Sequence, residues 1–257
     1  MSALDAVLVM LAGLAAGAIN TVVGSGTLVT FPTLLVLGYP PLTANVSNNI
    51  GLVAGGLSGS WGYRHELAGQ SRTVRRLLPM SLAGSVLGAT LLLLLPSSAF
   101  KAIVPALVAL ALVLVVVGPR LQRAAARRHT DPRPQAPWRG VALSAAVLLS
   151  GVYGGYFGAA QGILMMGVFS ALSPMPLQRA TGLKNVLVTL VNLVATVAFL
   201  LFARDHVDWP VVLLIAIGSL AGGVLGARVG RRLDPGILRA TILLVGTVAL
   251  VKLVWLP

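Results

Sequence analysis

The chain has 257 residues, of which 57% are hydrophobic and only 10% charged, and its mean hydropathy is +0.93. A soluble domain of this length needs a much more charged surface, and the apolar runs are continuous rather than alternating, which argues against a barrel. Cysteine is absent, which excludes disulfides, thiolate metal sites and cysteine nucleophiles. The composition therefore predicts an all-α, multi-pass protein of the cell (inner) membrane, with the lipid bilayer as its surroundings.

Ten apolar segments follow one another along the chain. We expect them at about residues 4–23, 26–38, 44–63, 77–96 and 100–118, and again at about 141–159, 161–173, 180–203, 210–228 and 237–256. The second segment of each set has roughly 13 residues, or about 20 Å of helix, which is too short for the ~30 Å hydrocarbon layer. Both sets therefore have the same order of long and short elements.

A short motif shows that the chain is made of one unit twice. Residues 81–89 return 138 positions later as residues 219–227, with eight of nine positions identical. We expect residues 1–118 and 141–257 to be two membrane repeats of about five helical elements each, joined by a basic cytoplasmic linker at 119–140. Duplicated halves that enclose a site at their interface are typical of secondary transporters.

The charge pattern predicts how these halves are oriented. The net charge of +13 comes mainly from Arg in the loops 64–76, 119–140 and 228–239, whereas the loops 204–209 and 96–101 are nearly neutral. Basic loops lie in the cytoplasm, so this charge indicates topology rather than nucleic-acid binding, and we expect no nucleic-acid partner. Equivalent loops differ in charge, so the halves should be inverted. The charges fit ten crossings, and they also fit a smaller number of crossings with a re-entrant hairpin in each half.

Two polar, glycine-rich breaks precede the short elements. The first contains Asn20, Gly24, Ser25, Gly26 and Thr27, and the second contains Tyr156, Gln161 and Gly162. We align Gly26 with Gly162 as equivalent break points, because glycine permits a chain break and close backbone approach. Free N–H groups at the start of the following helix attract an anion, and two inverted copies would direct two helix starts at one site. Tight helix packing through glycine is the alternative interpretation.

A second polar group opens the third element of each half. It comprises Asn48 and Asn49 in the first half, and Lys184 and Asn185 in the second. Lys184 is the one cation clearly placed within a span, so it either contacts a ligand or snorkels to the cytoplasm. Together with the breaks, these residues form the predicted substrate-binding set. The three histidines fit no metal-binding spacing, and we expect no metal, no cofactor and no enzymatic activity.

Several of these stretches resemble one family of membrane proteins. Residues 24–35, 151–159 and 183–185 are similar to those of the TauE/SafE sulfite exporters. The resemblance implies transport of sulfur-containing anions such as sulfite, sulfoacetate or related sulfonates. The two inverted halves predict that this transport occurs by alternating access. A carrier or channel for cations or neutral solutes, and a non-transporting membrane subunit, remain as alternatives. The oligomeric state cannot be read from the chain.

The charge pattern predicts that the linker is cytoplasmic and that both termini are external. Because the chain has no cysteine, single cysteines at Ser2 and in the linker can be probed with an impermeant thiol reagent on intact cells. We expect labelling at residue 2 only. Labelling of the linker in place of residue 2 would reverse the assigned orientation.

Overall fold

The computed structural model describes residues 1–127, 138–229 and 235–255, and these residues form helices and connecting turns. The α-helices, in chain order, are α1 (Ala3–Val22), α2 (Thr27–Val36), α3 (Pro41–Gly62), α4 (Ser71–Leu94), α5 (Ser97–Arg127), α6 (Trp138–Tyr156), α7 (Gln161–Leu172), α8 (Leu177–Phe202), α9 (Trp209–Val229) and α10 (Pro235–Trp255). Short 3-10 turns lie at Arg64–Leu67 and Arg204–His206. The predicted all-α class and the order of long and short elements are confirmed.

Five of these helices are long and apolar enough to cross a bilayer: α1, α4, α5, α8 and α9. The short elements are α2, with 10 residues, and α7, with 12. The expected linker 119–140 is helical at both ends, because α5 continues to Arg127 and α6 begins at Trp138. Part of the charge argument concerns Arg128, Arg133, Arg231 and Arg232, which lie outside the described residues.

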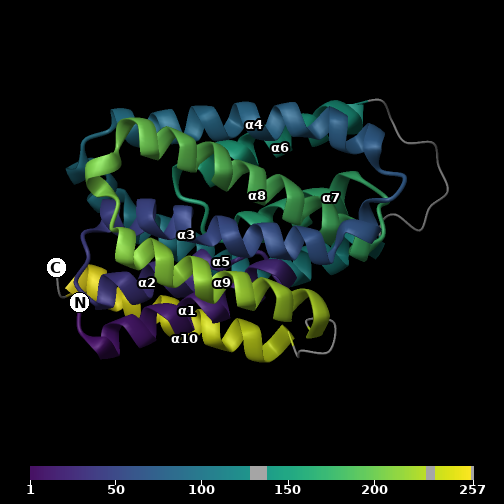
Figure 1. Cartoon of the computed structure of the whole chain (residues 1–257). Coiled ribbons are helices and arrows are strands. Elements are labelled where there is room, and N and C mark those ends of the chain that lie inside the picture. Colours follow the sequence, from purple (N-terminus) through teal and green to yellow (C-terminus); the bar gives the residue numbers. More distant parts are fainter. Residues whose placement is uncertain (128–137, 230–234, 256–257) are drawn as a thin grey trace.

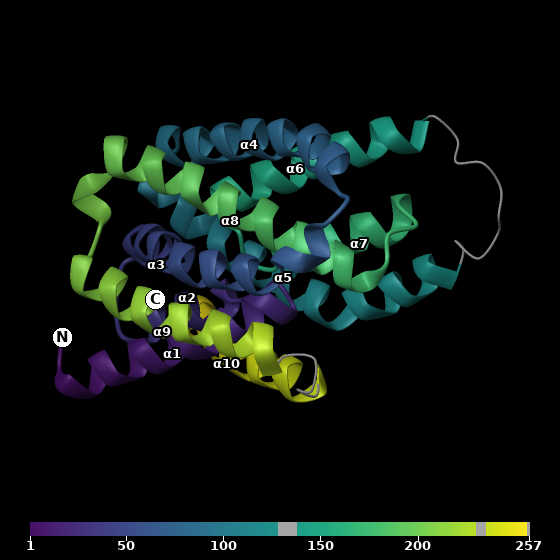
Figure 2. The same ribbon diagram turned by 45° about the vertical axis from the view of Figure 1, so that its right-hand side comes forward.

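The short helices belong to two hairpins that enter the molecule from opposite ends. Both termini lie at one end, whereas α5 ends and α6 begins at the other (Figures 1 and 2). Helix α2 returns to the terminal end, where Lys252 near the end of α10 donates hydrogen bonds to the carbonyls of Leu35 (3.0 Å) and Val36 (2.7 Å). The turn between α1 and α2 meets the turn between α6 and α7 inside the molecule. This arrangement favours re-entrant hairpins over ten full crossings.

The duplicated motif packs in the same way in both halves. It lies in α9, which packs against α1, and in α4, which packs against α6. A Cβ atom added at Gly222 would lie 2.0 Å from the carbonyl oxygen of Leu14, and one added at Gly84 would lie 2.2 Å from that of Leu148. Glycine is therefore required at both positions, since a side chain would separate the helices. The motif recurs because each half needs the same close helix contact.

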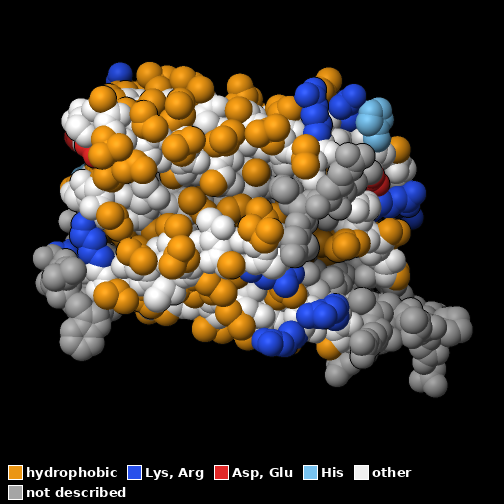
Figure 3. Space-filling model, turned by 90° about the horizontal axis from the view of Figure 1, so that it is seen from below, with side chains coloured by type: hydrophobic (Ala, Val, Ile, Leu, Met, Phe, Trp, Pro, Cys, Tyr) orange, Lys and Arg blue, Asp and Glu red, His pale blue; other side chains and the backbone are white. Residues whose placement is uncertain are grey.

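The outer flank of the helix bundle is apolar. Large exposed hydrophobic side chains lie on several helices, among them Leu8, Leu94, Leu149, Phe202 and Leu244. In the view from below, hydrophobic side chains cover most of the flank, while Lys and Arg gather mainly toward the end away from the termini (Figure 3). An apolar belt with charges at its edge is the surface that a bilayer requires. The chain is therefore a multi-pass membrane protein.

Candidate functional site

Each hairpin turns at a glycine with a left-handed backbone. After α1, the Gly24 N–H donates to the Ile19 carbonyl at 3.0 Å, and after α6 the Gly158 N–H donates to the Tyr153 carbonyl at 3.0 Å. The φ angles of Gly24 and Gly158 are 88° and 77°. Such angles disfavour residues with a side chain, so glycine ends both helices in the same way. The structure therefore makes Gly24 and Gly158 the equivalent break points.

The predicted equivalence of Gly26 and Gly162 is wrong. Gly26 has right-handed backbone angles and immediately precedes α2, whereas Gly162 is the second residue of α7. The spacing between equivalent residues is 134 at the breaks and 138 in the duplicated motif, so it changes along the chain. When the alignment of the two repeats is extended back from their third elements, it pairs Gly26 with a residue two positions beyond the true equivalent in the second repeat.

The two breaks touch each other through their backbones. The Gly162 N–H donates a hydrogen bond to the Gly24 carbonyl at 3.0 Å. A Cβ atom at Gly162 would lie 2.4 Å from the Gly24 Cα, so neither position has space for a side chain. Ala160 between α6 and α7 has φ 60°, a left-handed conformation that costs a non-glycine residue about 1–2 kcal/mol. Strained backbone of this kind is concentrated at functional sites.

Lys184 joins helix α8 to the first break. Its amine donates hydrogen bonds to the carbonyls of Asn20 (2.8 Å) and Thr21 (3.1 Å) at the end of α1. Its Cδ lies 3.2 Å from the position that a Cβ atom on Gly24 would occupy. The side chain is only 1% exposed, so the snorkelling alternative is wrong. A cation at this place is favoured by the negative end of the helix dipole.

The two asparagines of α3 have different surroundings. Asn48 accepts a hydrogen bond from Thr30 and donates one to Thr27 at 3.5 Å, so it lies against the start of α2. Asn49 instead donates to Asn192 at 3.4 Å and accepts from Thr196 at 3.2 Å, and thereby joins α3 to α8. Of this predicted pair, the structure places Asn48 beside the first short helix and uses Asn49 in a helix–helix contact.

Four of the predicted residues carry buried polar atoms that have no hydrogen-bond partner among the described residues. They are Ser25 Oγ, Tyr156 OH, Gln161 Oε1 and Asn185 Nδ2. The Gln161 Nε2 atom is bonded to the Ser150 carbonyl at 3.1 Å, which leaves its oxygen free. A buried polar atom without a partner costs about 1–3 kcal/mol. All four residues lie on the two hairpins or in the first half of α8.

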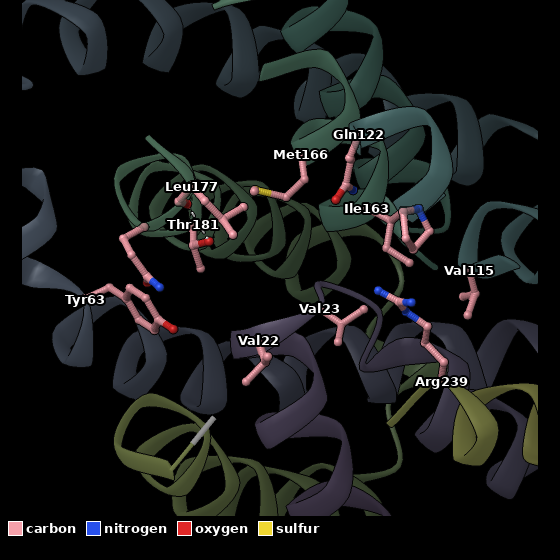
Figure 4. A pocket seen from close by; sticks show the side chains of 12 residues that line it. Val22, Val23, Tyr63, Val115, Gln122, Ile163, Met166, Leu177, Thr181 and Arg239 are labelled. Atoms are coloured by element: carbon pink, nitrogen blue, oxygen red, sulfur yellow. Dashed lines mark hydrogen bonds between the residues drawn. The ribbon is translucent and has the colours of Figure 1, made fainter. Parts of the chain in front are cut away.

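A cavity of about 240 Å³ leads to the breaks from the end away from the termini. It is lined by Val22 and Val23 next to the first break, by Ile163 and Met166 of α7, by Thr181 of α8 and by Arg239 of α10 (Figure 4). Thr181 lies one helical turn before Lys184. The cavity therefore connects one face of the protein with the residues around the meeting point.

Aromatic rings fill the corresponding space on the terminal side. Phe31 and Phe157 are edge-to-face with centroids 5.2 Å apart, and Phe100 lies 5.8 Å from Tyr156 and 6.3 Å from Phe157. Tyr156 and Phe157 occupy, at the end of α6, the positions that the two cavity-lining valines occupy at the end of α1. Small side chains leave a cavity on one side, and large ones close the other. The ring of Tyr156, one of the predicted site residues, is thus part of the aromatic cluster.

Sequence reasoning missed two parts of this site. Arg239 was assigned to the basic loop 228–239, but it lies in α10 and lines the cavity. Val22 and Val23 lie at the end of the predicted apolar segment 4–23, where nothing in the local pattern distinguishes them from other apolar residues. Their comparison with Tyr156 and Phe157 in the other repeat is a sequence signal that could have identified them, once the spacing at the breaks was known.

The cavity predicts that the breaks are accessible from one face only. In single-cysteine variants, we expect Val23→Cys to react with an impermeant thiol reagent supplied from the end away from the termini, and not from the terminal end. The matched variant Val29→Cys should be protected from both sides, because Val29 is 4% exposed and lies on α2 beyond the break. Equal modification of Val23→Cys from both faces would show that the aromatic cluster is not a barrier.

Comparisons with known proteins agree with this architecture. A profile of the family described as sulfite exporter TauE/SafE matches residues 9–253. The probable membrane transporter protein ORF9 of Sinorhizobium sp is 28% identical over 93% of this chain and 88% of its own length. A probable membrane transporter protein of Haemophilus influenzae is 26% identical over 95% and 92%, and the probable membrane transporter protein YfcA of Escherichia coli K12 is 25% identical over 93% and 86%. No solved structure matches the chain. The resemblance seen in the sequence is thereby confirmed, and the chain belongs to the TauE/SafE family of membrane transporters.

Proposed function

We propose that this transporter moves small anions by alternating access, and that its substrates are sulfur-containing oxyanions or sulfonates such as sulfite or sulfoacetate. One observation carries the proposal: the amine of Lys184 is buried beside the contact between the two chain breaks. A buried cation is costly unless a negative charge or several dipoles compensate it. Carbonyls of α1 compensate Lys184 in part, and a bound oxyanion would complete the compensation.

The distribution of acidic residues supports an anionic substrate. The chain has six of them, Asp5, Glu66, Asp131, Asp205, Asp208 and Asp234, and all lie near the ends of the apolar segments. No carboxylate within a span is therefore available to neutralise Lys184. A transporter that binds a cation at midplane would need the opposite charge balance.

The contacts of Lys184 also argue against the alternative of a cation carrier. Broken helices bind Na⁺ through carbonyls that the break leaves free. Here the amine of Lys184 already occupies the carbonyls of Asn20 and Thr21. The available groups are instead the start of α2 and the unpartnered atoms of Ser25 and Asn185, because the first N–H groups of α7 already have backbone acceptors. Helix starts and hydroxyl or amide donors are suited to the oxygens of an anion.

The difference between the two sides of the breaks supports alternating access. One side has a cavity lined by valines, and the other is filled by the aromatic cluster. The same elements repeat in both halves, so the halves could exchange these arrangements by rocking against each other. The family description names sulfite, and the relatives are described as probable membrane transporters. Sulfite and sulfonates share a compact head of oxygens with negative charge, which fits a site made of one free helix start, two side-chain donors and one amine.

The role of Lys184 can be tested in proteoliposomes that contain the full chain. Loss of one charge-assisted hydrogen bond costs about 1.5–3 kcal/mol, so we expect Lys184→Met to weaken substrate affinity about ten- to a hundredfold. Lys184→Arg should retain part of the affinity. The substrate panel should compare sulfite and sulfoacetate with sulfate, nitrate and a neutral solute.

A second lysine provides the matched control. Like Lys184, Lys252 donates to two backbone carbonyls at the end of a helix, in this case the short helix α2. Lys252 lies at the side of the molecule that holds the termini, away from the breaks. If Lys184 only closed the end of a helix, Lys184→Met and Lys252→Met would have equal effects on transport and on thermal unfolding. An unchanged affinity in a folded Lys184→Met variant would contradict the proposal. Uptake of the neutral solute alone would favour the neutral-solute carrier.

A further inference from the structure

The guanidinium of Arg239 is placed in the cavity that leads to the breaks. Arg239 lies near the start of α10, and its side chain points toward Val23 and Ile163 (Figure 4). None of the described residues that line this cavity is acidic. Within the described part of the chain, Arg239 forms no ion pair and no hydrogen bond through its side chain. Its charge is therefore directed at the space through which a solute would reach Lys184.

The other repeat has a cation at the equivalent position. Helices α5 and α10 begin at Ser97 and Pro235, which are separated by the same 138 residues as the duplicated motif. With this spacing, Arg239 corresponds to Lys101. Lys101 is exposed and follows Phe100, which belongs to the aromatic cluster on the terminal side. Each repeat thus carries one basic residue in the first turns of its last helix, and the two lie on opposite sides of the breaks.

We propose that Arg239 and Lys101 are substrate-attracting residues for the two entrances of the transport path. Arg239 acts on the anion that enters through the open cavity, and Lys101 acts on the anion that enters when the aromatic side opens. This inference rests on the proposed anion transport, and it adds a binding role for two residues outside the breaks. Both halves need such a residue because each half forms one entrance.

The physical effect of such a residue differs from that of Lys184. A charge at an entrance raises the local concentration of oppositely charged substrate and speeds its arrival, and this effect falls as ionic strength rises. It should therefore alter KM at low ionic strength and leave the maximal rate nearly unchanged. The effect should also be sided, because each residue faces one entrance only.

The test measures sulfite transport by the full chain in vesicles of known orientation, with substrate supplied on one face at a time. Arg239→Gln should raise KM about fivefold for sulfite supplied on the face away from the termini, which is the size expected from one nearby charge. It should change KM little for sulfite supplied on the terminal face. Lys101→Gln should show the reverse pattern, and Arg239→Lys should retain most of the wild-type KM.

Arg72→Gln is the matched control, because Arg72 is an exposed arginine at the same end of the molecule, in the first turn of α4 and outside the cavity. A general surface-charge effect would move KM equally in Arg72→Gln and Arg239→Gln, and this would overturn the inference. Equal effects of Arg239→Gln on both faces would also overturn it. If the wild-type protein moves no anion at all, the proposed function fails and the inference fails with it.

Discussion

The two chain breaks touch through their backbones inside the protein, and this contact limits how the surrounding helices can be placed. Inside a membrane, backbone that leaves the helix must find its hydrogen bonds within the protein. Here each break meets this need in part through the other, since the Gly162 N–H is bonded to the Gly24 carbonyl. That contact requires two residues without side chains, and it requires both hairpins to reach the same depth from opposite ends. The duplicated glycine motif satisfies the second requirement, because it holds α9 against α1 and α4 against α6 in the same way.

The electrostatics of the site follow from this geometry. The end of α1 presents carbonyls, and Lys184 binds them, so the negative end of that helix is covered by a cation. The start of α2 is left as a positive end at the meeting point, whereas the first N–H groups of α7 have backbone acceptors, among them the Gly24 carbonyl. One amine and one free helix start, with no carboxylate in a span, favour a negative charge in this region. The unpartnered Ser25 hydroxyl and Asn185 amide can donate to an oxyanion, whereas the Gln161 Oε1 atom can only accept, for example from water.

The sequence predicts the helical class and the two short elements, and it names polar residues that the structure places at and around the two breaks. It does not predict their contacts, because these depend on where each helix ends. The left-handed glycines are Gly24 and Gly158 rather than the aligned pair, since the spacing between repeats changes from 134 to 138 along the chain. The choice between snorkelling and burial for Lys184 depends on the position of α1, which no local pattern contains. The cavity arises from a difference in side-chain volume between Val22–Val23 and Tyr156–Phe157, and it becomes visible only when the repeats are superposed on the correct residues.

Protection of a thiol by a transported anion shows whether an anion binds where the two breaks meet. In the cysteine-free chain, a Val23→Cys variant places one thiol in the cavity directly before Gly24 of the first break, and a Gln122→Cys variant places one on the cavity wall farther from it. The rate of modification by a small maleimide is measured with and without sulfoacetate, which does not consume the reagent. Sulfoacetate is expected to slow modification of Val23→Cys and to leave Gln122→Cys unaffected. Equal rates for Val23→Cys with and without a saturating transported anion would show that no anion binds at the breaks.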